Sequence, residues 1–330
     1  MQERTAPPSP DDAFAGAVSG NGFAPAPTYF DQPVLKRPHW GWNVVTYLFL
    51  GGIMGGSSVI AALAHGKASL SERKLVTNAK VTSLVLAAAC PLVLISHLGR
   101  PERFLNMLRI VKFKSPMSLG VWGLVVFSGV ASASVVEDFA ERAVVPRWLT
   151  FIAPPGAHLL QALLGGFIGG YTGVLLSATA VPLWAKGKRH IPAISVASGI
   201  AGACALQSML LREDDLTAAH KLEKLELAAA SVELLLLLDF ERHAGSYGAP
   251  MFRGDRGKRL KTLTLGLGLA FPIAVNAFRL IVKPRGATAR AMTLATGLCA
   301  LFGGYILRET LIEAGKGSAD DPHAAFAQPE

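Results

Sequence analysis

The residues of this chain most suited to chemistry are acidic side chains that interrupt apolar sequence. Glu233 stands in the run Ala-Ala-Ala-Ser-Val-Glu-Leu-Leu-Leu-Leu-Leu (228–238), several residues from either polar flank. Glu226 lies seven residues earlier, which places both carboxyl groups on one face of a helix. Carboxyl groups inside an apolar helix are suited to carrying protons. The alternative is that Glu233 pairs with a polar group of a neighbouring helix and fixes its register.

A second set of polar side chains stands where apolar segments begin or end. His39, Asn43 and Tyr47 open the first such segment, and Asn43 and Tyr47 share a helical face because they are four residues apart. Tyr171 lies about two turns inside the fourth segment, where a buried hydroxyl group needs a hydrogen-bond partner. Three basic residues end apolar segments on the side where the first segment begins: His97, Arg100 and Arg308. They either join this polar group or extend to lipid headgroups.

These residues sit in a chain with the composition of a membrane protein. It is 51% hydrophobic and 17% charged, against about 25% charged in a typical soluble domain. Eight segments approach the ~20 apolar residues that a bilayer span needs. They lie at about 42–64, 75–96, 118–136, 157–182, 192–211, 218–240, 260–282 and 289–309. The sequence therefore predicts an all-α, polytopic integral membrane protein with eight transmembrane helices.

The segments outside these spans differ in composition. Residues 1–38 are rich in proline and contain no apolar run, which predicts a disordered tail rather than a signal peptide. Residues 39–316 would form the membrane domain and residues 317–330 a polar tail. An even number of spans puts both termini on one side. That side carries the excess of Lys and Arg, which favours the cytoplasm.

The net charge of +9 does not indicate a nucleic-acid partner, because the basic residues form short clusters between apolar segments, as membrane-flanking charges do. The cysteines Cys90, Cys204 and Cys299 are far apart and form no Cys-x-x-Cys motif. We therefore expect no iron–sulfur cluster and no other metal site in this chain. The eight histidines fall at segment ends, in loops or in the tail, so we expect no haem, which requires histidines facing each other inside the bilayer.

The loop after the second segment carries the most specific motif. Residues 98–104 read Leu-Gly-Arg-Pro-Glu-Arg-Phe, and residues 115–122 read Ser-Pro-Met-Ser-Leu-Gly-Val-Trp. They resemble the signature LGRP-x-RF … SPMS-x-G-x-W of the NrfD/polysulfide-reductase membrane-subunit family. The run around Tyr171 and the later Pro182-x-Trp184 also resemble that family's fourth helix. The resemblance covers roughly residues 38–316.

The resemblance implies eight transmembrane helices arranged as two four-helix bundles. It also implies a membrane anchor that exchanges electrons between a quinone and an iron–sulfur (ferredoxin-like) subunit, and through that subunit with a molybdopterin-type catalytic subunit. Menaquinone or ubiquinone would be an exchangeable substrate. In the family an Asn and a His of the first helix and a Tyr of the fourth hold the quinone headgroup. By position Tyr171 matches that Tyr, Tyr47 falls on or near the His, and Asn43 falls near the Asn. The family's acidic residue before LGRP is His97 here.

We therefore expect a respiratory-chain subunit of a bacterial inner membrane with three functional regions. The quinone-binding residues would be His39, Asn43, Tyr47, Tyr171, His97 and Arg100. The proton pathway would use Glu233 and Glu226. The basic loops 97–116 and 242–261 would dock the iron–sulfur subunit through Arg103, Arg109, Lys112, Lys114, Arg253 and Arg256.

Two other classes of protein stay open on the sequence. A secondary transporter or proton-conducting protein would use Glu233 as its relay without a quinone, and it would show inverted repeats with broken helices. The sequence contains no convincing repeat, although glycine-rich runs occur at 51–56 and 165–170. These runs suit close helix packing. The other class is a structural anchor with no working quinone site.

Overall fold

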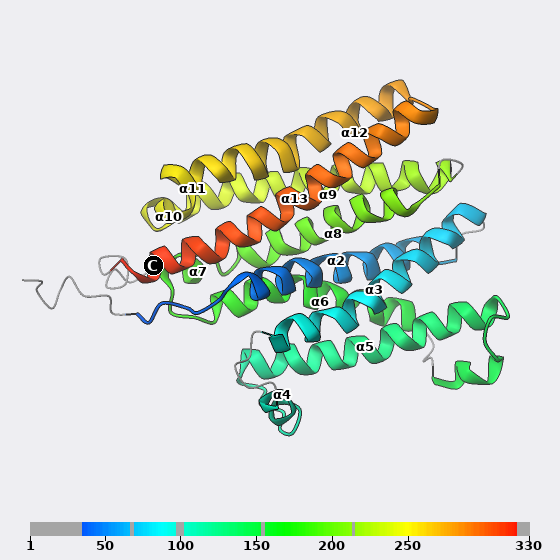
Figure 1. Cartoon of the computed structure of the whole chain (residues 1–330), viewed down its shortest axis with the longest axis horizontal. Coiled ribbons are helices and arrows are strands. Elements are labelled where there is room, and N and C mark those ends of the chain that lie inside the picture. The colour runs from blue at the N-terminus through cyan, green and yellow to red at the C-terminus, as the bar shows by residue number, and fades with distance from the viewer. Residues whose placement is uncertain (1–34, 67–68, 97–101, 153–155, 213–214, 322–330) are drawn as a thin grey trace, which may run out of the picture.

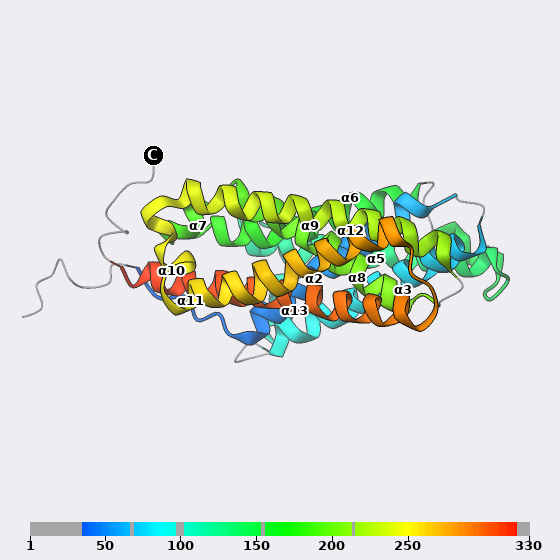
Figure 2. The same cartoon turned by 90° about the horizontal axis from the view of Figure 1, so that it is seen from above.

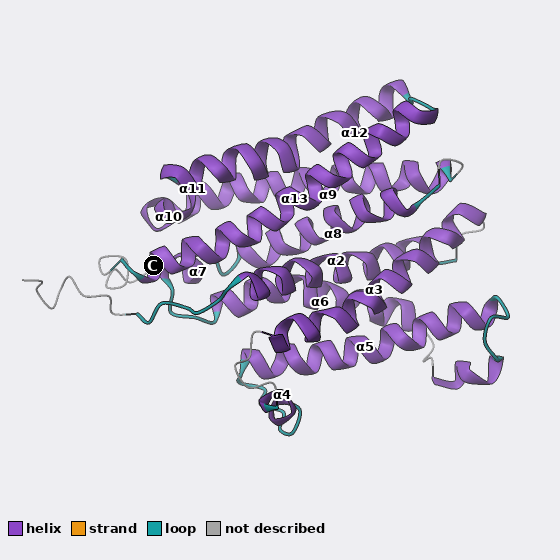
Figure 3. Ribbon diagram, viewed as in Figure 1, coloured by secondary structure: helices purple, strands orange, loops and turns teal. Residues whose placement is uncertain are grey.

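The described residues of the computed structural model, 35–66, 69–96, 102–152, 156–212 and 215–321, form helices and loops with no β-strand among them (Figure 3). The long helices run along the longest axis of the molecule (Figure 1), and they keep this direction when the molecule is turned (Figure 2). Arg37 and Asp320, near the two ends of the described chain, are adjacent, with Nε 3.8 Å from Oδ2. We call this end of the molecule the terminal end and the opposite end the distal end.

The first half of the chain supplies four long helices that contact one another. These are α2 (Trp42–Ala64), α3 (Leu70–Ser96), α5 (Pro116–Glu141) and α6 (Ala157–Ser177). Helix α2 packs against α3 and α6, and α5 packs against the same two helices. The short α4 (Arg103–Met107) lies at the terminal end between α3 and α5, and η3 (Arg147–Ile152) lies at the distal end (Figure 1).

The start of α5 follows from the Ser-Pro-Met-Ser motif. The Ser115 side chain accepts a hydrogen bond from the Ser118 backbone N–H at 3.5 Å, and Pro116 occupies the first turn. Serine is a favoured N-cap, and proline fits the first turn because that position needs no backbone donor. The motif therefore fixes where the chain turns back into the apolar layer.

The second half of the chain supplies α8 (His190–Leu210), α9 (Leu216–Ala244), α12 (Phe271–Val282) and α13 (Gly286–Ala319). Shorter elements at the terminal end are α7 (Pro182–Lys186), η4 (Gly245–Gly248), α10 (Ala249–Phe252) and α11 (Gly254–Arg259). Between α11 and α12 the chain stays helical through η5 (Leu260–Ala270), which has the wider hydrogen-bond spacing of a π-helix. Helix α9 packs against α8 and α12, and α13 packs against α8, η5 and α12.

Seven of the described helical segments are long and apolar enough to cross a membrane: α2, α3, α5, α6, α8, the continuous α11–η5–α12 and α13. Their cores coincide with seven of the eight expected spans. The remaining span, 218–240, forms α9, which is long enough but carries more charge than the others, so eight spans stay a prediction. Several helices extend beyond the expected bounds, because their last turns are polar. Helix α13, for example, reaches Ala319 rather than residue 309. Helix α6 differs in the opposite direction, because it ends at Ser177 rather than at residue 182.

Glycine allows α2 to lie directly against two neighbours. A methyl group on Gly55 would overlap the backbone carbonyl group of Gly165 in α6, and one on Gly56 would overlap that of Gly199 in α8. The close approach expected of the glycine-rich runs is therefore present. Such small residues at helix contacts are the usual means of association in lipid, where no hydrophobic driving force acts between helices.

Candidate functional site

An apolar cavity of about 300 Å³ lies at the terminal end between α2, α3, α5 and α6. This volume is at the lower limit of typical small-molecule sites. The lining is Trp40, Val44, Tyr47, Pro91, Leu94, Phe104, Met107, Met117, Gly120, Val121, Leu124, Val125, Ser128, Tyr171 and Leu175. Phe104 and Met107 come from α4, so the loop that carries the sequence motif also contributes to the cavity. We call it the terminal cavity.

Two tyrosines supply hydroxyl groups in this apolar lining. Tyr47 and Tyr171 are 6% and 4% exposed, and both line the cavity. Tyr171 donates a hydrogen bond to the carbonyl oxygen of Pro116, the first residue of α5. The Tyr47 hydroxyl has no hydrogen-bond partner among the described residues. One tyrosine is therefore fixed by the Ser-Pro-Met-Ser motif and the other is available to a ligand.

The other residues expected to bind a ligand lie at or outside the margin of the cavity. Asn43 does not line it and donates a hydrogen bond to Ser96 Oγ at 2.7 Å. His39 is exposed ahead of α2. His97 and Arg100 lie outside the described residues. The structure thus brings Tyr47 and Tyr171 together, with Asn43 one helical turn away.

Trp40 and Trp184 connect this cavity to the second half of the chain, a link that sequence reasoning missed. The two rings stack with centroids 5.1 Å apart. Trp184, in α7, is fully buried and its Nε1 donates to the carbonyl oxygen of Leu311 in α13 at 3.0 Å. The Pro-x-Trp motif was the available signal, since it placed a large aromatic residue directly after the fourth span.

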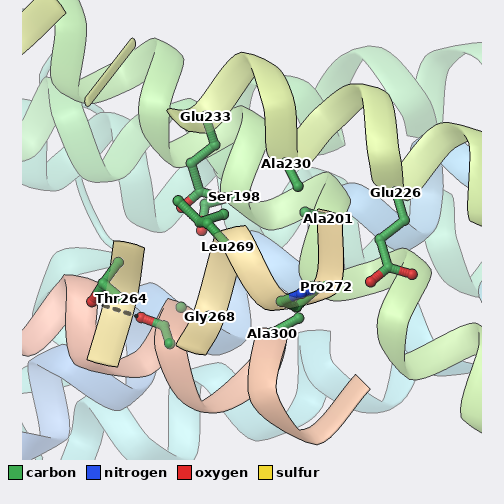
Figure 4. A pocket seen from close by; sticks show the side chains of 13 residues that line it. Ser198, Ala201, Glu226, Ala230, Glu233, Thr264, Gly268, Leu269, Pro272 and Ala300 are labelled. Carbon is green, nitrogen blue, oxygen red and sulfur yellow. Dashed lines mark hydrogen bonds between the residues drawn. The ribbon is translucent and has the colours of Figure 1, made fainter. Parts of the chain in front are cut away.

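The buried carboxyl groups lie in the second half of the molecule, on one face of α9 (Figure 4). Glu233 is 2% exposed and Glu226 is 3% exposed, and both line a small enclosed cavity together with Ser198 and Thr264. The volume of this cavity is about 10 Å³, close to the smallest space that holds one water molecule. Figure 4 shows Glu233 directed toward Ser198 and Glu226 directed away from it.

Arg308 of α13 is the cation that faces this group. It is 2% exposed and donates hydrogen bonds to Ser198 Oγ and to the Ser195 carbonyl oxygen, the latter at 3.3 Å. Glu233 is directed toward Ser198 (Figure 4), so the serine lies between the two charged side chains. Arg308 is therefore buried inside the molecule and does not reach lipid headgroups.

Around Glu226 several polar atoms are buried without a partner among the described residues. They are Glu226 Oε1 and both side-chain polar atoms of Asn276 in α12. One turn toward the distal end, Glu223 pairs with Arg279 at 2.5 Å. Buried polar groups of this kind are usually satisfied by ordered water, so this region has the polar atoms that a water-mediated proton path requires.

The cations expected to dock a partner lie at the terminal end (Figure 1). Arg109, Lys112 and Lys114 are exposed in the loop between α4 and α5, and Arg253 and Arg256 are exposed before and within α11. Exposed apolar side chains accompany the first three, with Phe113 79% exposed. The side chain of Arg103 lies outside the described residues. No group of three or more His, Cys, Asp or Glu residues in the described ranges is arranged to hold a metal ion.

Comparison with known proteins agrees with this architecture. The family model "Polysulphide reductase, NrfD" matches residues 33–317. The sequence is 24% identical over 304 residues to the C subunit of polysulfide reductase from Wolinella succinogenes, covering 84% of this protein and 94% of that one. It is 27% identical over 255 residues to protein NrfD of Escherichia coli (strain K12), covering 70% of this protein and 77% of that one.

The long apolar helices and the apolar cavity at the terminal end identify the class of protein as an integral membrane protein. The chain belongs to the polysulphide reductase/NrfD family. Membership of this family implies a role as the membrane anchor of an oxidoreductase complex.

Proposed function

We propose that the terminal cavity binds the headgroup of a membrane quinone, menaquinone or ubiquinone, and that the chain exchanges electrons between this quinone and an iron–sulfur partner subunit. The observation that carries the proposal is the pair Tyr47 and Tyr171, whose side chains both line a largely apolar cavity. Apolar walls with a few placed polar groups are typical of small-molecule sites. A quinone headgroup requires both, because its ring is apolar and its oxygens form hydrogen bonds.

The two hydroxyl groups take different roles in this proposal. The Tyr47 hydroxyl is free to donate to a quinone oxygen. Tyr171 already donates to Pro116, but a hydroxyl group has two acceptor lone pairs besides its single donor. Tyr171 can therefore accept a hydrogen bond from a quinol hydroxyl while it stays fixed to α5. His39, Asn43, His97 and Arg100 would line the approach from the membrane surface.

The iron–sulfur subunit would dock at the terminal end, where both basic loops expose their cations. Electrons leaving a quinol in the terminal cavity would pass to that subunit, which would carry the clusters that accept them one at a time. A molybdopterin-type catalytic subunit would bind the iron–sulfur subunit in turn. Both ends of the described chain lie at the terminal end. Docking of the partner from the cytoplasm would therefore place both chain ends on the cytoplasmic side.

We also propose that α9 crosses the membrane as an eighth span, and that the helices form two four-helix bundles, α2–α3–α5–α6 and α8–α9–α12–α13. The charges that exclude α9 from the apolar spans lie partly on its buried face, where Glu223 pairs with Arg279 and Glu233 is directed toward Ser198 (Figure 4). Charged residues inside membrane helices normally face the bundle interior and pair there. Within the second bundle, Glu233 and Glu226 would carry protons.

The test of the quinone site replaces each hydroxyl group separately. Tyr47→Phe and Tyr171→Phe should each lower quinone turnover of the assembled complex about 3- to 10-fold, the loss expected for one neutral hydrogen bond. Tyr305→Phe is the matched control, because Tyr305 lies outside the cavity and contacts Thr46 Oγ1 at 3.4 Å. Unchanged turnover in both fully assembled cavity variants would contradict the site and favour a structural anchor or a transporter.

A further inference from the structure

A second, polar cavity lies at the distal end, between the ends of α8, α9, α12 and α13. Its volume is about 510 Å³. The charged residues that line it are Arg212, Glu223, Arg279, Lys283, Arg285 and Arg290. We call it the distal basic cavity. Five cations and one carboxylate therefore face a single space.

Two of the five cations are engaged within the protein. Arg279 forms the 2.5 Å ion pair with Glu223, whose other oxygen lies 3.8 Å from His220 Nδ1. Arg290 donates to the carbonyl oxygens of Leu211 and Met209 at 3.0 and 2.9 Å. It thereby caps the C-terminal end of α8. These contacts hold the walls of the cavity in place.

The other three cations, Arg212, Lys283 and Arg285, form no ion pair within the described part of the chain. Asp215, in the adjacent loop, is already paired with Lys74 at 3.1 Å. Glu213 and Asp214 lie outside the described residues. The distal basic cavity therefore presents an excess of positive charge that its own carboxylate does not neutralise.

The backbone adds to this positive potential. Helix α13 begins at Gly286, which lines the cavity together with Ala289 in the first turn, and no side chain caps this end. The first N–H groups of a helix have no partner within the helix and carry a partial positive charge, so they favour an anion. The cationic side chains and the N-terminus of α13 therefore both favour an anionic ligand.

An apolar groove lies on two of the helices that form this cavity, α12 and α13. Phe271, Ala274, Val275 and Phe278 of α12 line it with Met292 and Ala295 of α13. Its volume is about 360 Å³ and its lining has no polar surface. Phe278 precedes Arg279 directly, and Met292 lies two residues after Arg290, so the groove and the cavity lie at the same height along both helices.

We propose that the distal basic cavity binds the phosphate group of an anionic phospholipid and that the apolar groove holds one of its acyl chains. Basic pockets between membrane helices are suited to anionic headgroups. A free phosphate ion would satisfy the cations equally well, but it would leave the apolar groove on the same helices unoccupied. The ligand therefore is a lipid with a phosphate headgroup and a net negative charge.

The first experiment measures lipid selectivity of the purified full-length chain by native mass spectrometry. Dioleoyl phosphatidylglycerol and dioleoyl phosphatidylcholine are the two probes, since they share acyl chains and differ in net charge. The proposal predicts one tightly retained phosphatidylglycerol that phosphatidylcholine does not replace. Equal retention of the two lipids would overturn it.

The second experiment removes charge at the cavity with Arg212→Gln/Arg285→Gln. A basic residue near a membrane surface contributes enough attraction that losing two should weaken phosphatidylglycerol retention roughly 10- to 30-fold. The matched control, Arg73→Gln/Arg147→Gln, removes two arginines from the distal end of the first half of the chain. An equal loss in both double variants would show general surface attraction and overturn the site.

A third variant separates the lipid from a free anion. Ala274→Phe fills the exposed groove without touching the cations, so it should weaken phosphatidylglycerol retention several-fold. Inorganic phosphate should not displace the lipid from the unaltered chain. Complete displacement by inorganic phosphate, with no effect of Ala274→Phe, would identify a simple anion site and contradict the lipid assignment.

Discussion

Gly120 is as important for the terminal cavity as the tyrosines that supply its hydroxyl groups. A side chain at Gly120 would overlap the ring and hydroxyl group of Tyr171. The Ser-Pro-Met-Ser-x-Gly motif therefore acts twice, since Pro116 accepts the hydrogen bond of Tyr171 and Gly120 makes room for its ring. This gives the motif a physical role at the site.

Gly120→Ala should accordingly displace Tyr171 and lower quinone turnover about 10-fold or more, because small displacements at a reacting site are costly. The assembled complex should still form. Gly129→Ala in the same helix is the control, because a methyl group there meets no atom within 4 Å. The readout is turnover per assembled complex, and equal turnover of the two variants would refute the packing argument.

Glu233 offers a second test at the scale of a single residue. Glu233→Gln keeps the shape of the side chain but removes the exchangeable carboxyl proton. We expect proton uptake by the complex in proteoliposomes to fall about 100-fold or more, within the range contributed by a positioned acid–base group. Quinone binding should persist, and Glu313→Gln, at a surface pair with Lys316, should change neither quantity.

If Glu233→Gln instead leaves proton uptake and quinone binding unchanged, the carboxyl group serves only to hold the helices in register. A loss of proton transport in the absence of any quinone requirement would favour the transporter alternative. The two proposals for this chain, quinone binding and proton transfer, are thus tested by substitutions at different residues.

The sequence alone predicted some of the residues at these two sites and missed others. Tyr171 and Tyr47 could be named because they stand in or near a family motif, and Glu233 because charge is rare in an apolar run. The roles of Trp184, Arg308 and the Glu223–Arg279 pair could not be predicted, since each depends on a contact between helices far apart in sequence. The link between Tyr171 and Pro116 likewise joins two motifs that the sequence shows only separately.

At the scale of helices, the glycine contacts decide how α2 packs. Gly55→Ala should lower the free energy of unfolding by about 1–3 kcal/mol, the usual cost of overpacking, because the new methyl group would overlap the backbone of α6. Gly166→Ala in α6 is the control, since its methyl group meets nothing within 4 Å. Thermal unfolding in detergent compares the two, and similar unfolding temperatures would contradict the close contact.

Helix positions were predictable from hydropathy, but helix ends were not. Polar first and last turns extend α3, α5 and α13 beyond the apolar runs, because helices continue past the hydrocarbon layer. The π-helical spacing of η5 gave no signal in the sequence. It occurs where Gly268 lies directly against Gly303 of α13, a contact between separate segments that composition alone does not show.

At the scale of the whole molecule, function divides between the two ends. The terminal end holds the apolar cavity, both ends of the described chain and the exposed basic loops, and the distal end holds the distal basic cavity. Membership of the family could be predicted from two short motifs, and the family model confirms it over residues 33–317. The position of the cavity relative to the loops required the structure, because α4 and four helices converge there.

This difference between the terminal and distal ends predicts where a partner subunit binds. Arg109→Gln/Lys112→Gln/Lys114→Gln should weaken association with the iron–sulfur subunit about 10-fold at low salt, and the effect should shrink as salt increases, because exposed charge pairs are screened. Arg73→Gln/Arg147→Gln/Lys224→Gln removes the same charge from positions toward the distal end. Equal weakening by both triple variants would place the partner elsewhere.

The most direct test of a quinone site at the terminal end is photo-cross-linking with a quinone analogue, carried out on the complex in native membranes and followed by peptide mapping. We predict labelling of residues that line the terminal cavity, on α2, α5 and α6, and competition by unmodified quinone. Labelling that excess quinone does not reduce, or that falls on α8, α9 or α12 instead, would contradict this site.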